Sequence, residues 1–147
     1  RKNLVNSGNI VVDSIVNYKL LSLGESDIEL LVNANIPDKM EVSDFDLTTI
    51  LGNLLDNSVR AVKETKENKY LSIDMQYKSG RLIIRLVNSY KHVEQIKNGK
   101  YFISTKKDKH KHGIGLLNVE RTVEKYNGMI DMKLVDNRFE AMVILYC

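Results

Sequence analysis

Cysteine occurs once in this sequence of 147 residues, as Cys147 at the last position, and proline occurs once, as Pro37. A single thiol excludes a disulfide framework and any metal site built from two or more cysteines. No apolar run is long enough to span a bilayer, and the chain does not open with a signal-peptide pattern. With only eight glycines, the composition is not that of a disordered or low-complexity chain. These absences indicate a soluble domain from a reducing compartment.

The length and composition fit one domain with its own hydrophobic core. Hydrophobic residues make up 43% of the chain and charged residues 28%, which is typical of a globular protein. We therefore treat residues 1–147 as a single domain. Because the first residue is Arg1 rather than methionine, we expect this domain to be a piece of a longer protein.

Positive charge is concentrated in residues 91–112. This stretch holds seven lysines and two acidic residues, a net charge of +5, whereas the whole chain carries +3. All three histidines, His92, His110 and His112, lie in the same stretch. Such a segment is either a solvated loop or a mobile segment that meets an anion, for example nucleotide phosphates or nucleic acid. Without a known nucleic-acid motif, it is weak evidence for binding to DNA or RNA.

The spacing of apolar residues predicts alternating helices and strands along one continuous domain, and therefore an α/β fold class. Helices are expected at 9–23, 44–66 and 113–128, and strands at 27–36, 70–78, 81–88, 129–134 and 139–145. Residues 79–80 and 136–138 are expected to form hairpin turns. The remaining segment, 89–112, is too long for an ordinary connection, so we expect a functional lid or a disordered loop.

A polar face on the predicted helix 44–66 is the first candidate site. Asn53, Asn57, Arg60 and Glu64 recur at steps of three or four residues, so they share one side of the helix. Each asparagine costs about 0.5 kcal/mol of helix propensity relative to alanine. Such a face is either simply solvated or binds a ligand. In the second case, the amide oxygen of Asn57 would coordinate a hard cation and Arg60 would reach phosphate oxygens.

Two glycines at the expected start of the last helix form the second candidate site, in the segment His112–Gly113–Ile114–Gly115–Leu116. Glycine lets the backbone approach a ligand closely, and the free amides of a helix start favour an anion. The dinucleotide-binding motif needs a third glycine, and the P-loop needs Gly-Lys-Ser/Thr, so neither is present. Taken alone, the two glycines are a weak signal.

The order of these features closely resembles the GHKL ATPase superfamily, which includes DNA gyrase, heat-shock chaperones, MutL and histidine kinases. The resemblance rests on Asn53–Leu–Leu–Asp–Asn57–Ser, a strand pair, a basic lid and the His112–Leu116 segment. Within the superfamily, the chain is similar to the ATP-binding catalytic domain of sensor histidine kinases, specifically quorum-sensing receptors of the accessory-gene-regulator type. Their opening pattern is matched at Gly8–Asn9, Asp13–Ser14–Ile15, Asn17 and Lys19.

The resemblance covers nearly the whole chain and implies a Bergerat fold. This is a two-layer α/β sandwich in which helices cover one face of a mixed sheet. ATP would lie between the helices, beneath a long lid formed by about residues 89–112.

The resemblance also implies roles for individual residues of the long helix and the third strand. Asn57 would coordinate Mg²⁺, Asn53 would face the nucleotide one turn earlier, and Arg60 would contact phosphate. The Asp-x-Gly-x-Gly box that usually follows the third strand is missing. Here Asn88, at the end of that strand, is the candidate for accepting a hydrogen bond from the adenine amino group.

The lid and the last helix complete the implied site. Gly113 and Gly115 would meet phosphate through their amides, with His112, Ile114 and Leu116 beside them. Phe102 followed by Thr105 and Lys106 resembles the end of the lid, with Lys106 as the candidate contact to the γ-phosphate. The lid is expected to be mobile when empty and ordered by ATP.

The implied cofactors are ATP and Mg²⁺, and the implied reaction is transfer of the γ-phosphate to a histidine on an upstream dimerisation helix. The implied partners are that histidine-bearing domain, a second copy of the full-length protein and a response regulator, and no nucleic acid is expected. None of His92, His110 and His112 suits the role of acceptor, because all lie in the lid region. The domain is expected on the cytoplasmic side of a membrane-anchored receptor kinase.

Other functions stay open on the same residues. A serine-kinase anti-sigma factor of the same fold would act without a dimerisation helix. A nucleic-acid-binding module would use the basic stretch, and its affinity would depend steeply on salt whatever stands at Asn57. A hydrolytic GHKL ATPase is disfavoured, because those enzymes carry a glutamate where this chain has Asn53.

Overall fold

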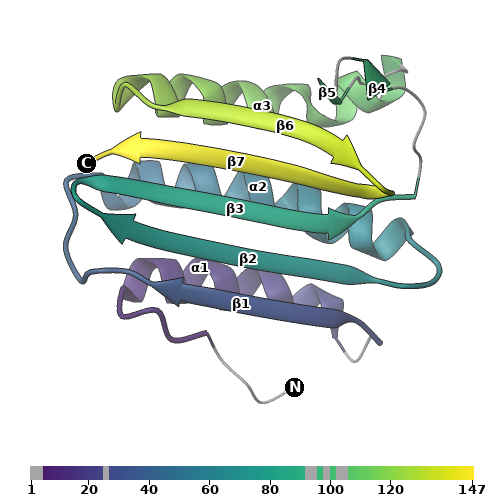
Figure 1. Cartoon of the computed structure of the whole chain (residues 1–147), viewed down its shortest axis with the longest axis horizontal. Coiled ribbons are helices and arrows are strands. Elements are labelled where there is room, and N and C mark those ends of the chain that lie inside the picture. The colour runs from purple at the N-terminus through teal and green to yellow at the C-terminus, as the bar shows by residue number, and fades with distance from the viewer. Residues whose placement is uncertain (1–4, 25–26, 92–95, 98–99, 102–105) are drawn as a thin grey trace.

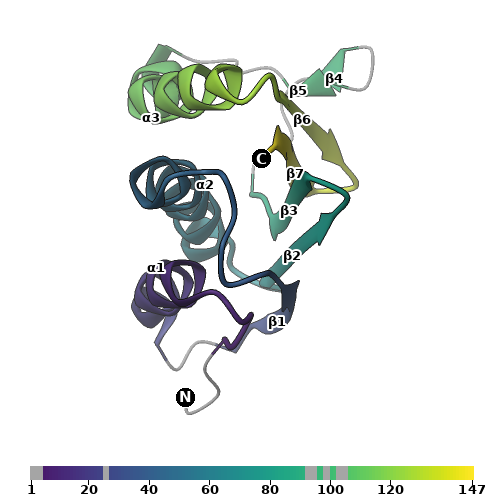
Figure 2. The same ribbon diagram turned by 90° about the vertical axis from the view of Figure 1, so that its left-hand side faces the viewer.

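The computed structural model describes residues 5–24, 27–91, 96–97, 100–101 and 106–147, with side chains for 5–24, 27–91 and 114–147. A five-stranded sheet forms one layer, and the helices α1, α2 and α3 lie together on one of its faces (Figures 1 and 2). This arrangement confirms the two-layer α/β sandwich with a mixed sheet that the sequence predicts.

Helices α1 and α2 begin at side-chain caps. Helix α1 (Ile10–Leu20) follows Asn9, whose amide oxygen accepts hydrogen bonds from the backbone of Val11 and Val12, and continues into a 3₁₀ turn, η1 (Leu21–Leu23). Helix α2 (Asp44–Glu64) follows Ser43, whose hydroxyl accepts a hydrogen bond from the backbone of Asp46. Such caps stabilise a helix by about 1 kcal/mol each. Helix α3 spans Lys106–Lys125.

The sheet has the strand order β1-β2-β3-β7-β6. Its strands are β1 (Glu29–Asn35), β2 (Tyr70–Lys78), β3 (Arg81–Ser89), β6 (Met129–Val135) and β7 (Arg138–Tyr146). Only the β1–β2 pair is parallel, and the other three pairs are antiparallel. Both predicted hairpin turns are confirmed, since Ser79 and Gly80, and likewise Asp136 and Asn137, have the positive φ values of tight two-residue turns.

The hydrophobic core lies between the helices and the sheet. On β3, Leu82, Ile84 and Leu86 are fully buried, and they alternate with residues on the open face of the sheet. The predicted apolar stripe of α2 meets them and is buried over its whole length, at Leu47, Ile50, Leu51, Leu54, Leu55, Val59 and Val62. Burying one such side chain contributes about 1.5–3 kcal/mol. The polar side of α2 is therefore turned away from the core.

The predicted start of the last helix is wrong. Helix α3 begins at Lys106, not at Gly113, so both glycines lie inside it. Residues 106–112 contain no glycine or proline and are rich in lysine, a good helix former. Each glycine costs about 1 kcal/mol in a helix relative to alanine. The burial of Val119 and Val123 against the core offsets that cost.

The segment 89–112 is consequently not one irregular loop. Ser89 still belongs to β3, and two short strands, β4 (Ile96–Lys97) and β5 (Lys100–Tyr101), pair with each other. The first residues of α3 occupy its end, and β5 lies close to β6 (Figure 1). Residues 92–95, 98–99 and 102–105 lie outside the described residues.

The predicted helix stop near Gly128 is confirmed, although a different residue makes the turn. Helix α3 ends at Lys125, and Asn127 takes the positive φ of the left-handed position. The backbone of Gly128 donates a 3.0 Å hydrogen bond to the carbonyl of Val123, which closes a Schellman motif. A Cβ atom on Gly128 would overlap the carbonyl oxygen of Ile144. Glycine is needed there because β7 approaches so closely.

Candidate functional site

The structure places the four residues predicted on the polar face of α2 outside the core: Asn53, Asn57, Arg60 and Glu64, of which Glu64 is exposed. Asn53, Asn57 and Arg60 are each half-buried. The Arg60 guanidinium donates a 3.3 Å hydrogen bond from Nη1 to Oδ1 of Asn57. The Asn53 amide donates from Nδ2 to the carbonyl of Thr49 at 2.8 Å. The guanidinium and the amide oxygens are thus held in fixed positions on one side of the helix.

Helix α3 approaches this face at Gly115. A Cβ atom on Gly115 would lie only 3.0 Å from Oδ1 of Asn53. The oxygen of Asn53 is therefore turned toward α3, and a side chain at Gly115 would crowd it. Glycine at this position lets α3 lie close to the Asn53 side chain.

The role predicted for the amides of Gly113 and Gly115 needs correction. Free amides occur only in the first turn of a helix, and both glycines lie beyond the first turn of α3. The argument from a helix start therefore does not apply to them. For Gly115, the structure supports close approach of two helices as the physical reason for glycine.

The structure describes the side chains of only some of the other residues predicted near these glycines. Ile114 is 75% exposed, whereas Leu116 is half-buried and packs against the core. Lys106 and His112 belong to α3, but their side chains lie outside the described part of the chain. Thr105 lies outside the described residues altogether.

Asn88 is buried at the end of β3, with 1% of its surface exposed. The alternation along β3 places it on the helix-facing side, as for Leu86. Its Nδ2 donates to the carbonyl of Ser89 at 2.9 Å. One N–H group of the amide is thereby bonded to the backbone, which fixes the orientation of the Asn88 side chain.

The C-terminal end of α2 contacts the end of β3 beside Asn88. The hydroxyls of Thr65 and Ser89 lie 3.2 Å apart, and Ser89 also accepts a hydrogen bond from the backbone of Tyr70. Thr65 follows Asn57 by eight residues, which is about 12 Å along a helix axis. The candidate site is thus elongated, with an amide at a buried end and a guanidinium and amides nearer α3. This arrangement suits a ligand with a polar ring at one end and negative charge at the other.

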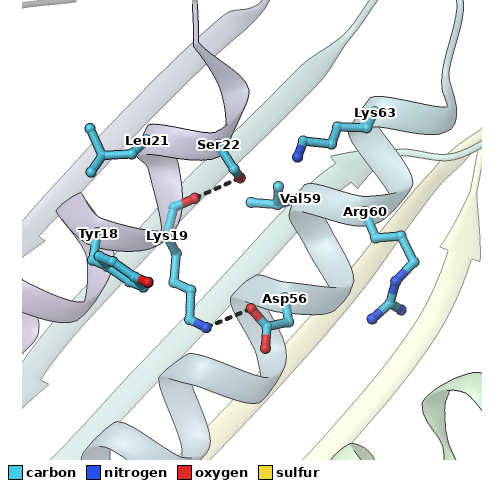
Figure 3. A pocket seen from close by; sticks show the side chains of 8 residues that line it. All are labelled: Tyr18, Lys19, Leu21, Ser22, Asp56, Val59, Arg60 and Lys63. Atoms are coloured by element: carbon cyan, nitrogen blue, oxygen red, sulfur yellow. Dashed lines mark hydrogen bonds and ion pairs between the residues drawn. The ribbon is translucent and has the colours of Figure 1, made fainter.

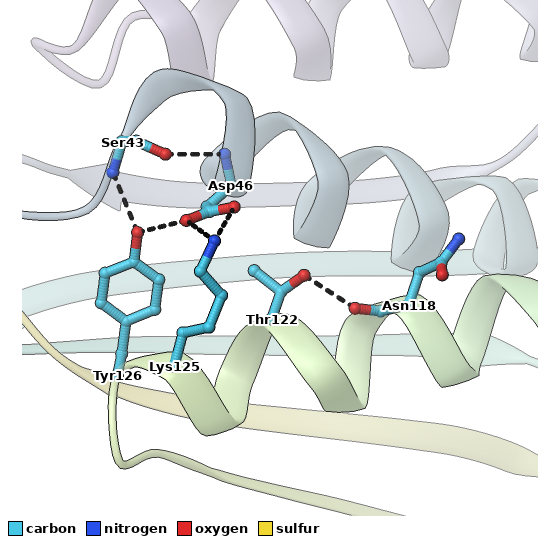
Figure 4. Close-up of polar contacts among 6 residues, drawn as sticks. All are labelled: Ser43, Asp46, Asn118, Thr122, Lys125 and Tyr126. Carbon is cyan, nitrogen blue, oxygen red and sulfur yellow. Dashed lines mark hydrogen bonds and ion pairs between the residues drawn. The ribbon is translucent and has the colours of Figure 1, made fainter.

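A second polar cluster joins the start of α2 to the end of α3 (Figure 4). Asp46 is 4% exposed, and its carboxylate accepts hydrogen bonds from the Tyr126 hydroxyl at 2.5 Å and from Lys125 at 3.1 Å. The Tyr126 oxygen in turn accepts a 3.2 Å hydrogen bond from the backbone of Ser43. We call Ser43, Asp46, Lys125 and Tyr126 the α2–α3 latch.

The contacts within the latch shift the pKa values of its two charged residues, Asp46 and Lys125. The hydrogen bond from Tyr126, and next that from Lys125, hold the pKa of Asp46 below its ordinary value. Asp46 raises the pKa of Lys125. Sequence patterns missed this cluster because Asp46 and Tyr126 are 80 residues apart. The only local hint is an acidic residue in the first turn of a helix, which the helix dipole alone explains.

The donor atoms on α2 fit a magnesium ion only in part. Among the residues whose side chains are described, no group of three or more His, Cys, Asp or Glu could hold a metal ion. The oxygen of Asn57 is a hard donor of the kind that Mg²⁺ prefers, and Mg²⁺ on a nucleotide needs few protein ligands. In the same described part of the chain, no helix combines the length and the hydropathy that a membrane span requires.

Solved structures of histidine kinases share this fold. The catalytic domain of histidine kinase ThkA, in a nucleotide-free form, matches with a TM-score of 0.70 and 15% identity, over 98% of this chain and 95% of that chain. The mycobacterial sensor histidine kinase MprB gives a TM-score of 0.65 and 14% identity, over 92% and 91%. Histidine kinase AdeS of Acinetobacter baumannii gives 0.66 and 16%, over 93% and 63%. At these identities the likeness shows the fold alone. A search of curated protein sequences gives no match.

The sequence itself matches a family model. The model described as "GHKL domain" covers residues 42–146, which include the polar face of α2, Asn88 at the end of β3 and Gly115 on α3. The match therefore spans the elements that build the candidate site, and the fold agrees with it. The chain belongs to the GHKL family of ATP-binding domains.

Proposed function

We propose that this chain is the ATP-binding catalytic domain of a sensor histidine kinase of the accessory-gene-regulator type, with ATP and Mg²⁺ as cofactors. It would transfer the γ-phosphate of ATP to a histidine on an upstream dimerisation helix. The full-length protein would be a membrane-anchored homodimer with this domain in the cytoplasm, and a response regulator would receive the phosphate. The proposal rests chiefly on Asn53 facing Gly115, with the hydrogen-bonded pair Asn57 and Arg60 farther along the same helix, within a fold shared with histidine-kinase catalytic domains.

The residues of α2 would bind and orient the triphosphate. Arg60 would place its guanidinium against phosphate oxygens, which it can contact with two N–H groups at once. The Asn57 oxygen would hold Mg²⁺, which supplies positive charge to offset that of the phosphates. Thr105 and Lys106 are proposed to complete the phosphate end of the site.

At the other end of the site, Asn88 would select the base. Because its Nδ2 donates to the Ser89 carbonyl, its oxygen is the group proposed to accept a hydrogen bond from the adenine amino group. A base that carries a keto group in place of that amino group has no hydrogen to donate to the Asn88 oxygen. Burial of Asn88 strengthens the preference, since an unpaired polar group there is costly.

The amide side chain of Asn53 favours transfer of the phosphoryl group to a histidine over hydrolysis of ATP. An amide is not a general base, so Asn53 cannot take a proton from water. A histidine acceptor needs little activation, because its imidazole is mostly neutral near pH 7. The protein then contributes position and electrostatic stabilisation of the transferred phosphoryl group.

The test is incubation with radiolabelled ATP and Mg²⁺, alone and with the histidine-bearing domain from the same full-length protein. Alone, the chain should gain no acid-labile phosphate. With the acceptor domain, the label should appear on the acceptor histidine and disappear when that histidine is replaced by glutamine. Arg60→Ala should lower the rate at least about tenfold, the usual scale for a lost phosphate contact. Arg138→Ala changes an arginine that stacks on Tyr70 and serves as the control.

Two outcomes would contradict the proposal. Stable label on His92, His110 or His112 would remove the upstream acceptor. Label on a serine of a partner protein would favour the anti-sigma-factor kinase instead.

A further inference from the structure

Exposed apolar side chains gather on the solvent side of the seam between α1 and α2. The described residues include eleven exposed large hydrophobic side chains, and four of them lie along this seam: Ile10, Tyr18, Leu21 and Phe45. Phe45 is 78% exposed although it stands in the first turn of α2. A cluster of this kind on an otherwise polar helix surface marks an interaction site.

The seam is hollowed along its length. An apolar hollow of about 660 Å³ lies among Ile10, Ile15 and Phe45, and a second hollow of about 580 Å³ lies beside Lys19 and Lys63. Tyr18 lines both hollows, so they lie next to each other along the seam, and we call the two together the α1–α2 groove.

The ends of the α1–α2 groove differ in charge. The second hollow is lined by Lys19, Arg60 and Lys63 against the single acidic residue Asp56 (Figure 3). Lys19 and Asp56 form an ion pair of 2.7 Å across the seam. Lys63 is directed toward the hollow, while the guanidinium of Arg60 is turned to the other side of α2 (Figure 3).

The apolar end carries one charge of its own. Asp44 lies in the first turn of α2, where the helix dipole favours a negative side chain. The groove thus has an apolar end and a cationic end.

The shape of the groove suits a helix. It follows α1, whose 11 residues correspond to about 17 Å, or three helical turns. Gly52 on α2 faces α1 across the seam, since a Cβ there would lie 3.9 Å from side-chain atoms of both Ile15 and Lys19. An amphipathic helix laid in such a groove anchors aromatic and aliphatic side chains at the centre and charged ones at the rim.

A second copy of this chain does not suit the same groove. In a two-fold dimer the two grooves would run either in the same or in opposite directions. The first arrangement brings the cationic ends together, and the second places each cationic end on an apolar one. A partner with the complementary pattern avoids both conflicts.

We propose that the α1–α2 groove is a docking site for an amphipathic helix of a partner, with apolar residues over Ile10 and Phe45 and carboxylates over Lys63. The proposal does not depend on ATP binding, because the groove lies on the opposite flank of α2 from Gly115 and α3. Apolar contact would supply the affinity, and the charges would supply the direction of the helix.

The probe is a pair of fluorescent synthetic helices of about three to four turns. Both helices carry a stripe of leucines. The last turn of the first helix carries glutamates (the glutamate helix), and the last turn of the second carries lysines (the lysine helix). Fluorescence anisotropy, without nucleotide, should show saturable binding of the glutamate helix about tenfold tighter than of the lysine helix. Phe45→Ser should weaken binding of both helices, and Lys63→Glu should reverse the preference.

Matched controls lie away from the groove. Met129→Ser removes a hydrophobic side chain that is 61% exposed on β6, and Lys78→Glu reverses an exposed lysine at the β2–β3 turn. Both should leave the affinities unchanged, and binding of the glutamate helix should shift the amide NMR signals of Phe45 and Gly52. The proposal would be overturned if the peptides showed no saturable binding at millimolar concentration. It would also be overturned if either Phe45→Ser or Lys63→Glu left the affinities unchanged.

Discussion

Asn57 and Arg60 lie one turn apart on α2, and the hydrogen bond between them holds the Asn57 oxygen and the Arg60 guanidinium side by side. An asparagine inside a helix costs about 0.5 kcal/mol relative to alanine, and one hydrogen bond to a charged group returns a comparable or larger amount. The helix therefore tolerates asparagine at this position, and the hydrogen bond holds its oxygen where the proposed site would use it.

We predict that Asn57→Ala abolishes Mg²⁺-dependent ATP binding and lowers the free energy of unfolding by no more than about 2 kcal/mol. The gain in helix propensity partly offsets the lost hydrogen bond, whereas the proposed oxygen ligand of the cation has no substitute. Titration of a fluorescent ATP analogue with and without Mg²⁺ measures the first effect, and urea unfolding the second.

Asn33→Ala is the matched control, because Asn33 is an exposed asparagine on β1 outside the candidate site. It should bind the analogue like the unchanged protein. If Asn57→Ala kept its Mg²⁺-dependent affinity with an intact circular dichroism spectrum, Asn57 would not belong to the site.

At the scale of elements, the α2–α3 latch fixes how the two helices of the candidate site lie relative to each other. It joins the first turn of α2 to the last turn of α3, far along both helices from Asn53 and Gly115. Asp46 is buried and ionised, so the loss of a partner leaves a charge without full compensation. We therefore expect the latch to dominate the effect of point changes at this end of α3.

We predict that Tyr126→Phe lowers the free energy of unfolding by about 2 kcal/mol at neutral pH. The folded-state pKa of Asp46 is lowered, so its contribution is present above the ordinary aspartate pKa of about 3.9 and is lost as the pH falls through the folded value. Without the phenol hydroxyl that pKa rises. The variant should therefore begin acid unfolding at a higher pH, and its deficit should shrink at lower pH.

Urea unfolding across a pH series measures both effects, with Tyr146→Phe as control because Tyr146 is 48% exposed at the end of β7. A deficit of the same size at neutral and at strongly acidic pH would show that Asp46 is not the partner that matters.

For the whole molecule, ligand binding and folding are linked. A ligand that binds only the folded state at a hundred times its Kd adds about 2.7 kcal/mol to stability. For a domain of this size, that corresponds to a rise in Tm of about 5–10 °C. The proposed site spans α2, α3 and β3, so its ligand would bridge the helical layer and the sheet.

We predict that millimolar ATP with Mg²⁺ raises Tm by several degrees, and that EDTA removes most of the rise because the cation is part of the bound complex. Differential scanning fluorimetry measures it, and GTP with Mg²⁺ serves as the control for base selection by Asn88. An equal rise with GTP would contradict that selection, and no rise with either nucleotide would contradict the proposed cofactors.

Much of the architecture was predictable because it depends on local patterns. The strand 70–78 was predicted with its observed bounds, and the helix predicted at 44–66 ends two residues early, at Glu64. Alternation along β3 and the apolar stripe of α2 are periodic signals that any short window contains. The same periodicity brought Asn53, Asn57 and Arg60 onto one face, which the structure confirms.

Other features depended on contacts between residues far apart in the chain. The start of α3 at Lys106 went against a local glycine signal, because helix propensity and burial of Val119 and Val123 outweigh two glycines. The meeting of Gly115 with Asn53, the latch at Asp46 and the α1–α2 groove each join two helices, and no local pattern encodes such a contact. Periodicity along the chain was therefore enough for the fold class and the polar face of α2, whereas contacts between distant elements decided the roles of Gly115, Asp46 and Phe45.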